Sequence, residues 1–416
     1  MTFETLKRSH LKRNILIAVV IVLVLSAIIL TFTRAKYKVI DSMPLLNGTI
    51  NYTLADLNIV EMYLNGEAID VLPDGNYELT EESYCTNAEN VRDESITLNY
   101  DGSTKTFTVA PFNKKGTKCY LYFEEGATAG DTILASENAP TGQTTDWTNN
   151  GTGTTYYYTG NPNNWVQFAG FYWRIIRING DGTIRMIYQG VADSETPDND
   201  NITGTGTQIG TSAFNSSYND NMYVGYMYTS GQRQGHDNPS TIKDILDQWY
   251  QQNLLDDADK IDGNAGFCGD RRTSSGIGTG TSSTYYQSYT RISNSNPSLN
   301  CEDADIYTTK GSSTGNVALD YPIGLISADE AMLAGIPWAG ASTSTYLYTN
   351  TTYWTMSPCW YYYGYAREFL VNSYGGLLYD VYVNSTAGVR PVINLKADTP
   401  ILSGDGSSET PFVITE

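Results

Sequence analysis

The sequence predicts an α+β protein whose larger part combines antiparallel strands, two helices and long loops, preceded by a transmembrane helix and a small all-β domain. Three observations support this fold class. At 416 residues, the chain is long enough for two or three domains. Its 33 tyrosines and 38 glycines, with abundant Ser, Thr and Asn, favour strands and polar loops over helices. Beyond the N-terminal region, only two segments carry the caps and apolar spacing of a helix.

The charge of the chain is divided unevenly. The first 38 residues hold seven basic residues against one acid, whereas the rest holds 18 basic residues against 44 acidic ones. A body this acidic repels phosphate backbones. We therefore predict that the protein does not bind nucleic acid.

Residues 15–33 form a run of 19 residues without a charge. As a helix, this run spans about 28 Å, close to the thickness of a bilayer core. It is longer than the core of a cleavable signal, and no A-x-A site follows it. We predict that residues 1–38 are a cytoplasmic tail and a transmembrane signal anchor, so the membrane is a partner. The protein is then a single-pass cell-membrane protein with an extracellular body; a buried soluble helix is the alternative.

Residues 39–123 have the pattern of a small β domain or stalk. The dipeptide Asp101-Gly102 is a hairpin signal between two of its strand-like runs. A Glu- and Gly-rich stretch follows, so we assign residues 124–139 to a linker and residues 140–416 to a larger domain. The strand-like runs of the small domain lie at 59–64, 96–100, 105–109 and 119–123.

The larger domain begins with an antiparallel meander that turns at residues 179–182. Ser240 is placed to cap one helix, and Ser327 with Glu330 has the spacing of a capping box for a second. A long polar stretch separates the two helices. The strands predicted for this domain lie at 166–168, 171–178, 184–188, 353–355, 366–372, 378–383 and 389–395.

Five cysteines occur in the chain. If the body is exported, their spacing indicates two disulfides, Cys85–Cys119 and Cys268–Cys301. Free structural thiols are the alternative. Cys359 is left without a partner, inside the stretch PCWYYYGYAR that begins at Pro358.

Three segments resemble bacterial domains of the C-type-lectin-like fold. WVQFAGFYWRIIR from Trp165 resembles their opening strands, and YWTMSP from Tyr353 resembles their "YW-T-SP" segment. GVRPVINL from Gly388 resembles their terminal "GVRP-NL" strand, which is itself similar to the "GFR" ending of formylglycine-generating-type domains. The match covers roughly residues 140–396 and implies a C-type-lectin-like domain.

Bacterial proteins of this fold include surface domains and the variable proteins of diversity-generating retroelements. In the latter, adenine-directed mutagenesis rewrites Asn-type codons near the C-terminus into codons for Tyr, Ser, Asp, Gly, Cys or Arg. Residues 359–385 resemble such a segment in composition and location. Trp360 departs from the pattern, because its codon does not arise from an Asn codon in this way.

Eight tyrosines lie between Tyr353 and Tyr382. Tyrosine provides a large, stiff contact area at low entropic cost, and Ser, Gly and Asn add adaptable hydrogen bonds, a combination typical of paratopes. We predict a cell-surface ligand-binding protein, adhesin-like or receptor-like, whose ligand is an extracellular protein or glycan. The predicted ligand-binding residues are Trp360, Tyr361, Tyr362, Tyr363, Tyr365, Arg367, Tyr374, Tyr379, Tyr382 and Asn384.

Two other functions are open: a formylglycine-generating-type enzyme, and a structural envelope protein whose tyrosines pack its interior. The enzyme family depends on a pair of active-site cysteines, whereas the C-terminal region has Cys359 alone. His236 is the single histidine of the body, which excludes a His-rich metal site and leaves a Ser-His-Asp triad only through this residue. We predict no catalytic residue, no metal site and no cofactor.

Overall fold

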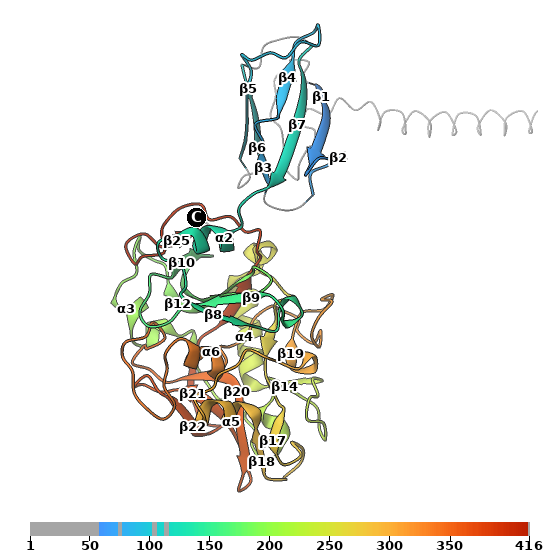
Figure 1. Cartoon of the computed structure of the whole chain (residues 1–416). Helices are drawn as coiled ribbons and strands as arrows, with labels where there is room; N and C mark the ends of the chain where they lie inside the picture. Colours follow the sequence, from blue (N-terminus) through green and yellow to red (C-terminus); the bar gives the residue numbers. More distant parts are fainter. Residues whose placement is uncertain (1–57, 74–76, 102–105, 112–115, 415–416) are drawn as a thin grey trace, which may run out of the picture. The chain divides into compact units, whose positions relative to one another are not determined.

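The computed structural model of the chain describes residues 58–73, 77–101, 106–111 and 116–414. The chain divides into two compact units, and the division falls between Glu124 and Glu125 (Figure 1). This point lies at the start of the predicted linker, 124–139. The predicted tail and signal anchor, residues 1–38, lie outside the described residues.

No helix within the described ranges is long and apolar enough to cross a membrane. The predicted location, a single-pass membrane protein with an extracellular body, is contradicted by this finding and is withdrawn. The run at 15–33, on which the prediction was based, lies outside those ranges.

The first unit is built on a sheet of strand order β2-β1-β7-β3, with β4 paired to β7, and on a separate hairpin of β5 and β6. Alternate residues of β7, Cys119, Leu121 and Phe123, are buried, as expected for a strand that covers a core with one face. A disulfide joins Cys119 to Cys85, its register partner on β4. The strands are β1 (Asn58–Leu64), β2 (Glu67–Ile69), β3 (Tyr77–Leu79), β4 (Tyr84–Thr86), β5 (Thr97–Asp101), β6 (Thr106–Ala110) and β7 (Lys118–Glu125).

The first large sheet of the second unit has the order β24-β12-β11-β10-β25, with β9 paired to β11 and β8 to β9. Its centre is the meander that the sequence predicted. The turn between β11 and β12 closes with a hydrogen bond from the Asn179 N–H to the Thr183 carbonyl, and Gly182 supplies the positive φ of 86° that the turn requires. The strands are β8 (Gly142–Thr145), β9 (Thr154–Tyr157), β10 (Trp165–Phe168), β11 (Phe171–Ile178), β12 (Ile184–Val191), β24 (Val392–Leu395) and β25 (Phe412–Val413).

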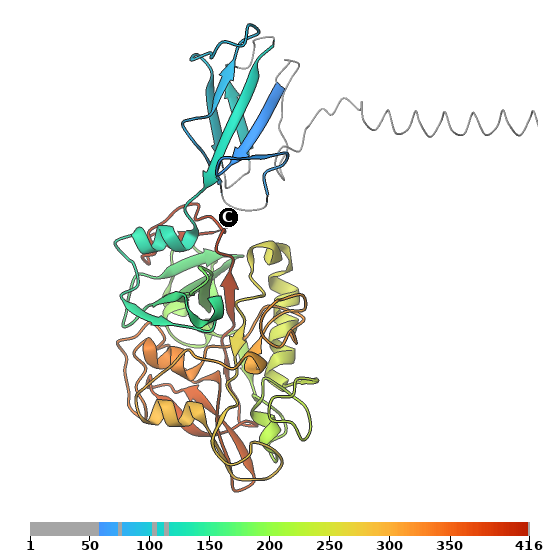
Figure 2. The ribbon, with the colours of Figure 1, turned by 45° about the vertical axis from the view of Figure 1, so that its right-hand side comes forward.

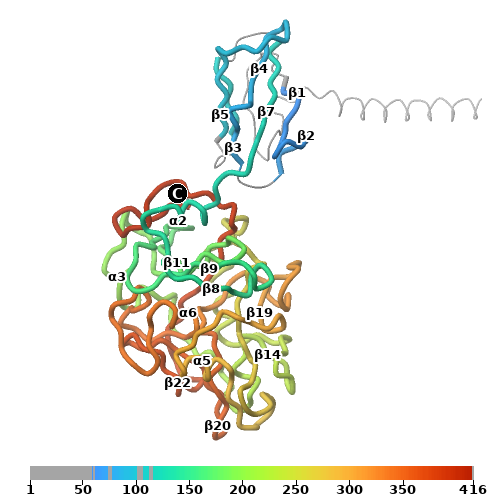
Figure 3. Tube along the Cα trace, in the orientation of Figure 1, coloured from blue at the N-terminus to red at the C-terminus, as the bar shows by residue number. Residues whose placement is uncertain are grey.

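The second large sheet has the order β13-β23-β20-β18-β17, with β21 paired to β20 and β22 to β21. Its longest hairpin, β20 with β21, lies at one end of the unit (Figures 1 and 3). The segment GVRPVINL supplies both β23 and β24 and so passes from the second sheet to the first; Arg390 between them is fully buried and donates to the Tyr188 carbonyl. The strands are β13 (Gly210–Ser212), β17 (Thr273–Ser275), β18 (Thr284–Tyr286), β20 (Tyr353–Tyr362), β21 (Tyr365–Val371), β22 (Leu377–Tyr382) and β23 (Ala387–Val389).

Two short strand pairs complete the second unit, β14 (Met227–Tyr228) with β15 (Asn238–Pro239) and β16 (Phe267–Cys268) with β19 (Ile306–Tyr307). Beside the second pair, a disulfide joins Cys268 to Cys301. The structure thus forms both disulfides that the spacing indicated.

Both predicted helices are present. Ser240 caps α4 by accepting from the Lys243 N–H, and the capping box of Ser327 and Glu330 starts α6. A helix that the sequence reasoning missed, α2, lies inside the predicted linker, where Thr128 and Asp131 form a capping box that could have indicated it. The helices are α2 (Ala129–Ala135), α3 (Asn199–Ile202), α4 (Thr241–Asn253), α5 (Gln287–Ser293) and α6 (Ala328–Leu333).

The predicted α+β class is wrong. The described residues are mostly β-sheet and about 16% helical, and among their α-helices only α4 is longer than seven residues. The long Ser-, Thr- and Gly-rich connections lack the apolar periodicity that would bury one face of a helix, and short helices are unstable without such a face.

Four charged side chains are fully buried between the first large sheet and α6. Arg177 on β11 pairs with Asp146 and lies 3.0 Å from the Glu330 carboxylate, and Arg185 on β12 lies 2.5 Å from the same carboxylate. Burial alone would raise the pKa of Glu330, but Arg185 and Arg177 outweigh it and hold the pKa below its ordinary value. The network therefore fixes α6 on the sheet.

Candidate binding face

The tyrosine-rich stretch forms a β-hairpin. Tyr362 pairs with Tyr365, so Tyr363 and Gly364 make a two-residue turn. Both have positive φ, 50° and 83°, as a type I′ turn requires. Within residues 353–362, the sequence predicted a strand only at 353–355. Strand β20 continues to Tyr362 because it pairs with β18 as well as β21, and the pairing with β18 has no local signal.

Seven aromatic side chains at this end of the second unit form one continuous surface. Trp360 is central, with ring centroids 5.5 Å from Tyr285, 4.7 Å from Tyr289 and 5.2 Å from Tyr379. Six of the seven are half-buried, four of these six pack against the core, and Tyr363 is 80% exposed. We call this surface the aromatic face, and its residues are Tyr285, Tyr289, Trp338, Trp360, Tyr362, Tyr363 and Tyr379.

The ring contacts continue beyond Trp360 on two sides. Trp338 stacks on Tyr379 at 4.5 Å, and Tyr362 lies 4.1 Å from Tyr363 and 6.5 Å from Tyr285. The rings therefore contact one another, and no member stands alone.

Several elements supply the aromatic face. Pairing of β18 with β20 places Tyr285 opposite Trp360, and α5, which carries Tyr289, packs against β20 and α6. Figure 2 shows α5 and α6 side by side below the first large sheet. Sequence reasoning missed Tyr285, Tyr289 and Trp338, because they are far from the hairpin in sequence. The one local signal was the run TYYQSY, which holds two of them.

Two of the predicted binding residues are buried. Tyr361 is 2% exposed, and its hydroxyl donates to the Asn219 carbonyl at 2.9 Å, because strand alternation turns it toward the core. Arg367 is 6% exposed; it donates to the Tyr362 carbonyl at 3.0 Å and pairs with Asp380. Both side chains support the hairpin, and their prediction as ligand contacts is corrected.

The other predicted residues reach the surface outside the aromatic face. Tyr365 stacks between Tyr218 and Tyr382, with centroids at 5.1 and 4.4 Å. Asn384 is exposed. Tyr374 is 72% exposed and has no ring partner among the described residues, so it provides an isolated surface tyrosine for comparison.

Cys359 is buried beside this hairpin. The other four cysteines are held in disulfides, so no second thiol is free to act with it. Burial, with a smaller contribution from the Glu368 carboxyl, raises the pKa of the Cys359 thiol well above its ordinary value. A buried, protonated thiol is a poor nucleophile, so the geometry does not favour the alternative of a two-cysteine oxidase of the formylglycine-generating type.

Glu368, on β21, is fully buried, and neither of its carboxyl oxygens has a hydrogen-bond partner in the described part of the chain. Burial raises its pKa well above the ordinary value, and the attraction of Arg271 only partly opposes this effect. The Glu368 carboxyl group, in the sheet behind the aromatic face, is therefore more stable in its protonated, neutral form when the chain is folded.

Within the described ranges, no group of His, Cys, Asp and Glu side chains is arranged to hold a metal ion. Two loop carboxylates that carry the oxygen atoms a cation would need have other partners: Asp198 caps α3, and Asp305 pairs with Arg271 at 2.9 Å. His236 is exposed.

Comparison with protein families, curated proteins and solved structures finds no match to this chain. The resemblance to C-type-lectin-like domains and to retroelement variable proteins therefore stays a prediction.

Proposed function

We propose that the second unit is a binding module that recognises a protein ligand through the aromatic face. One observation carries the proposal: seven rings from several elements contact one another in an unbroken series, and although six of them are half-buried, none is fully buried and Tyr363 is 80% exposed. Large exposed apolar patches are uncommon on soluble proteins and mark sites of interaction.

The arrangement of the rings favours a protein over a glycan. Rings that pack against each other, as Trp338 and Tyr379 do at 4.5 Å, cover one another's flat faces. The contacts of Trp360 with Tyr285, Tyr289 and Tyr379 are edge-to-face, so the rings are inclined to one another and form no single flat platform. Such a mixed surface of ring edges and phenolic hydroxyls suits the apolar side chains and peptide groups of a protein surface. Sugar rings, by contrast, stack on flat open ring faces.

The rival reading, a structural protein whose tyrosines fill its interior, requires the rings of the hairpin to be inaccessible. Tyr353 and Tyr361 of the hairpin are buried, whereas Tyr363 at its turn is 80% exposed and Tyr382 on the neighbouring strand is 38% exposed. These exposures support binding over a purely structural role.

The proposal is tested by selecting random peptides on the immobilised full-length chain and measuring their affinity for variants. We expect the double variant Tyr362→Ser/Tyr363→Ser to lose affinity for most selected peptides by about tenfold or more, the loss of about 1.4 kcal/mol. Tyr374→Ser, which removes a tyrosine that is 72% exposed outside the face, should leave affinity unchanged. Equal binding by the double variant and the parent chain would contradict the proposal.

A further inference from the structure

A concave site lies against the segment closed by Cys268 and Cys301. It is a cavity of about 600 Å³, within the range of small-molecule sites, and it shares no residue with the aromatic face. Its walls come from the turn after β8, the β11–β12 turn and the disulfide-linked segment.

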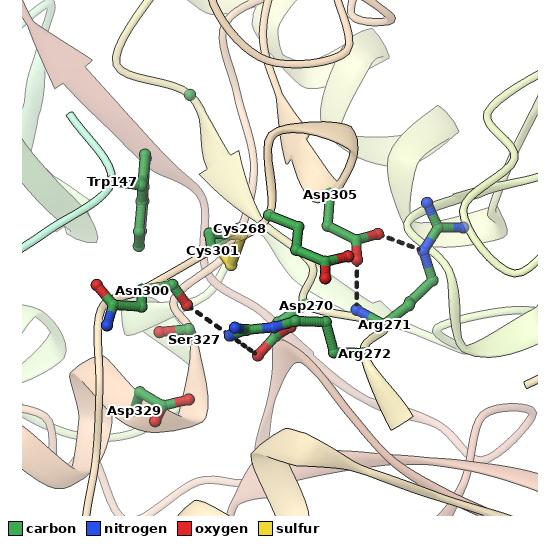
Figure 4. The surroundings of a disulfide bond; sticks show 12 residues. Trp147, Cys268, Asp270, Arg271, Arg272, Asn300, Cys301, Asp305, Ser327 and Asp329 are labelled. Atoms are coloured by element: carbon green, nitrogen blue, oxygen red, sulfur yellow. Dashed lines mark hydrogen bonds and ion pairs between the residues drawn. A yellow bond between two sulfur atoms is a disulfide. The ribbon is translucent and has the colours of Figure 1, made fainter. Parts of the chain in front are cut away.

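One wall of the cavity is the indole ring of Trp147. Its N–H donates to the Ala265 carbonyl at 2.7 Å, which fixes the ring in place. The guanidinium groups of Arg177 and Arg185 lie 4.4 and 5.6 Å from the ring centroid, and both belong to the buried ion network. Figure 4 shows the ring edge-on beside the disulfide.

The disulfide and a set of ion pairs stiffen the opposite wall. Arg272 donates to the Asn300 carbonyl at 2.8 Å, and its guanidinium lies 2.5 Å from Asp270 (Figure 4). Arg291 pairs with the same Asp270 at 2.6 Å. Asn300 and Cys301 are therefore held in place before any ligand arrives.

Amide groups that line the cavity are left open. The side-chain amides of Asn150, Asn264 and Asn300 line it and make no hydrogen bond with any described residue. Each such amide offers two donor hydrogens and one acceptor oxygen. The carboxylates of Asp181 and Asp303 line the cavity as well.

The charges around the cavity select the class of ligand. The one cation of its lining, Arg272, is already paired with Asp270, so the site disfavours phosphate. Two guanidinium groups over Trp147 withdraw electron density from its ring, which weakens stacking of an organic cation or of the polarised C–H groups of a sugar. An electron-rich, uncharged planar ring stacks most favourably on such an indole.

We propose that this cavity binds a neutral nucleoside. The base stacks on Trp147, the amides of Asn264 and Asn300 bond the donor and acceptor groups of its edge, and the carboxylates of Asp181 and Asp303 accept from ribose hydroxyls. This inference is independent of the aromatic face, since no residue is shared between the two sites.

The test uses the full-length chain with adenosine, guanosine, cytidine and uridine as probes, measured by calorimetry and by saturation transfer from protein to ligand protons. We expect at least one nucleoside to bind with a Kd of about 1 mM or tighter. Its 5′-monophosphate should bind about tenfold more weakly, because the acidic lining repels it.

Variants locate the binding. Asn264→Ala and Asn300→Ala remove exposed amides that make no hydrogen bond with the described residues, so they should leave the melting temperature unchanged and weaken binding about fivefold each. Tyr362→Ser/Tyr363→Ser should have no effect on nucleoside affinity. Absence of binding by all four nucleosides overturns the proposal, as does full affinity in both asparagine variants. Tighter binding of the monophosphate, of maltotriose or of spermidine than of any nucleoside also overturns it.

Discussion

Tyr363 occupies a backbone conformation that tyrosine disfavours. Its φ is 50°, its side chain is 80% exposed, and its one ring contact is with Tyr362 at 4.1 Å. A bulky residue in the left-handed region costs about 1–2 kcal/mol. The side chain therefore contributes little to folding, whereas it supplies the most exposed ring of the aromatic face.

Replacing Tyr363 with Asn should raise stability and lower binding together. Asn-Gly is the favoured pair in a type I′ turn, so Tyr363→Asn should increase the free energy of unfolding by about 0.5–1 kcal/mol in a denaturant titration. Peptides selected on the parent chain should bind this variant more weakly. A decrease in stability would show that the ring is needed by the fold.

Glu368 predicts a dependence of stability on pH. Its pKa is raised in the folded chain by burial. The folded state thus holds its proton more tightly than the unfolded chain does, and the resulting stability is complete below about pH 4, near the ordinary pKa of Glu. It is lost as the pH rises toward and through the folded pKa, by up to about 1.4 kcal/mol per pH unit.

Glu368→Gln removes this titration. Its free energy of unfolding should equal that of the parent chain near pH 4 and exceed it increasingly between about pH 5 and pH 7. Glu137→Gln, at an exposed position, is the matched control and should follow the parent curve. Parallel curves for Glu368→Gln and the parent chain would contradict the neutral buried carboxyl.

At the scale of the element, sequence prediction succeeded where the signal is local. The caps at Ser240 and Ser327 predicted α4 and α6, and the turn at 179–182 predicted the β11–β12 pair. The full length of β20 depends on pairing with β18, so neither the strand nor the contribution of Tyr285 to the face could be predicted from nearby residues. Strands of three residues, such as β2 and β4, are too short to show a period.

The capping residue of α6 has a second role that its motif did not predict. Glu330 caps the helix and also neutralises two buried arginines. Glu330→Gln keeps a side chain that can cap, but it leaves Arg185 without a carboxylate partner and Arg177 with Asp146 alone, so we expect a loss of about 3–5 kcal/mol in the free energy of unfolding. Ser327→Ala, which removes a cap alone, should lose about 0.5–2 kcal/mol. Similar losses in the two variants would show that the ion pairs contribute little.

At the scale of the whole molecule, the disulfide Cys268–Cys301 closes a segment that serves both proposed sites. Tyr285 and Tyr289 of the aromatic face lie inside this segment, and Asn300 and Cys301 line the cavity. The spacing of the cysteines indicated the bond. Neither site could be predicted in full from the sequence, because each combines residues that only the sheet pairings and the ion network bring together.

Removing this disulfide should affect stability and binding together. In the chain-entropy model, Cys268→Ser/Cys301→Ser lowers the free energy of unfolding by about 3–4 kcal/mol. Peptide affinity at the aromatic face should fall as well, because Tyr285 and Tyr289 lose their fixed positions. Unchanged affinity in a folded double variant would show that the hairpin alone carries the binding.

The central claim is that a partner covers the aromatic face. Hydroxyl-radical oxidation of the full-length chain, read residue by residue by mass spectrometry with and without a selected peptide, tests it most directly. We expect the peptide to protect Tyr285, Tyr362 and Tyr363 and to leave Tyr374, which is 72% exposed outside the face, as reactive as before. Unchanged oxidation of Tyr362 and Tyr363 with peptide bound would contradict the claim.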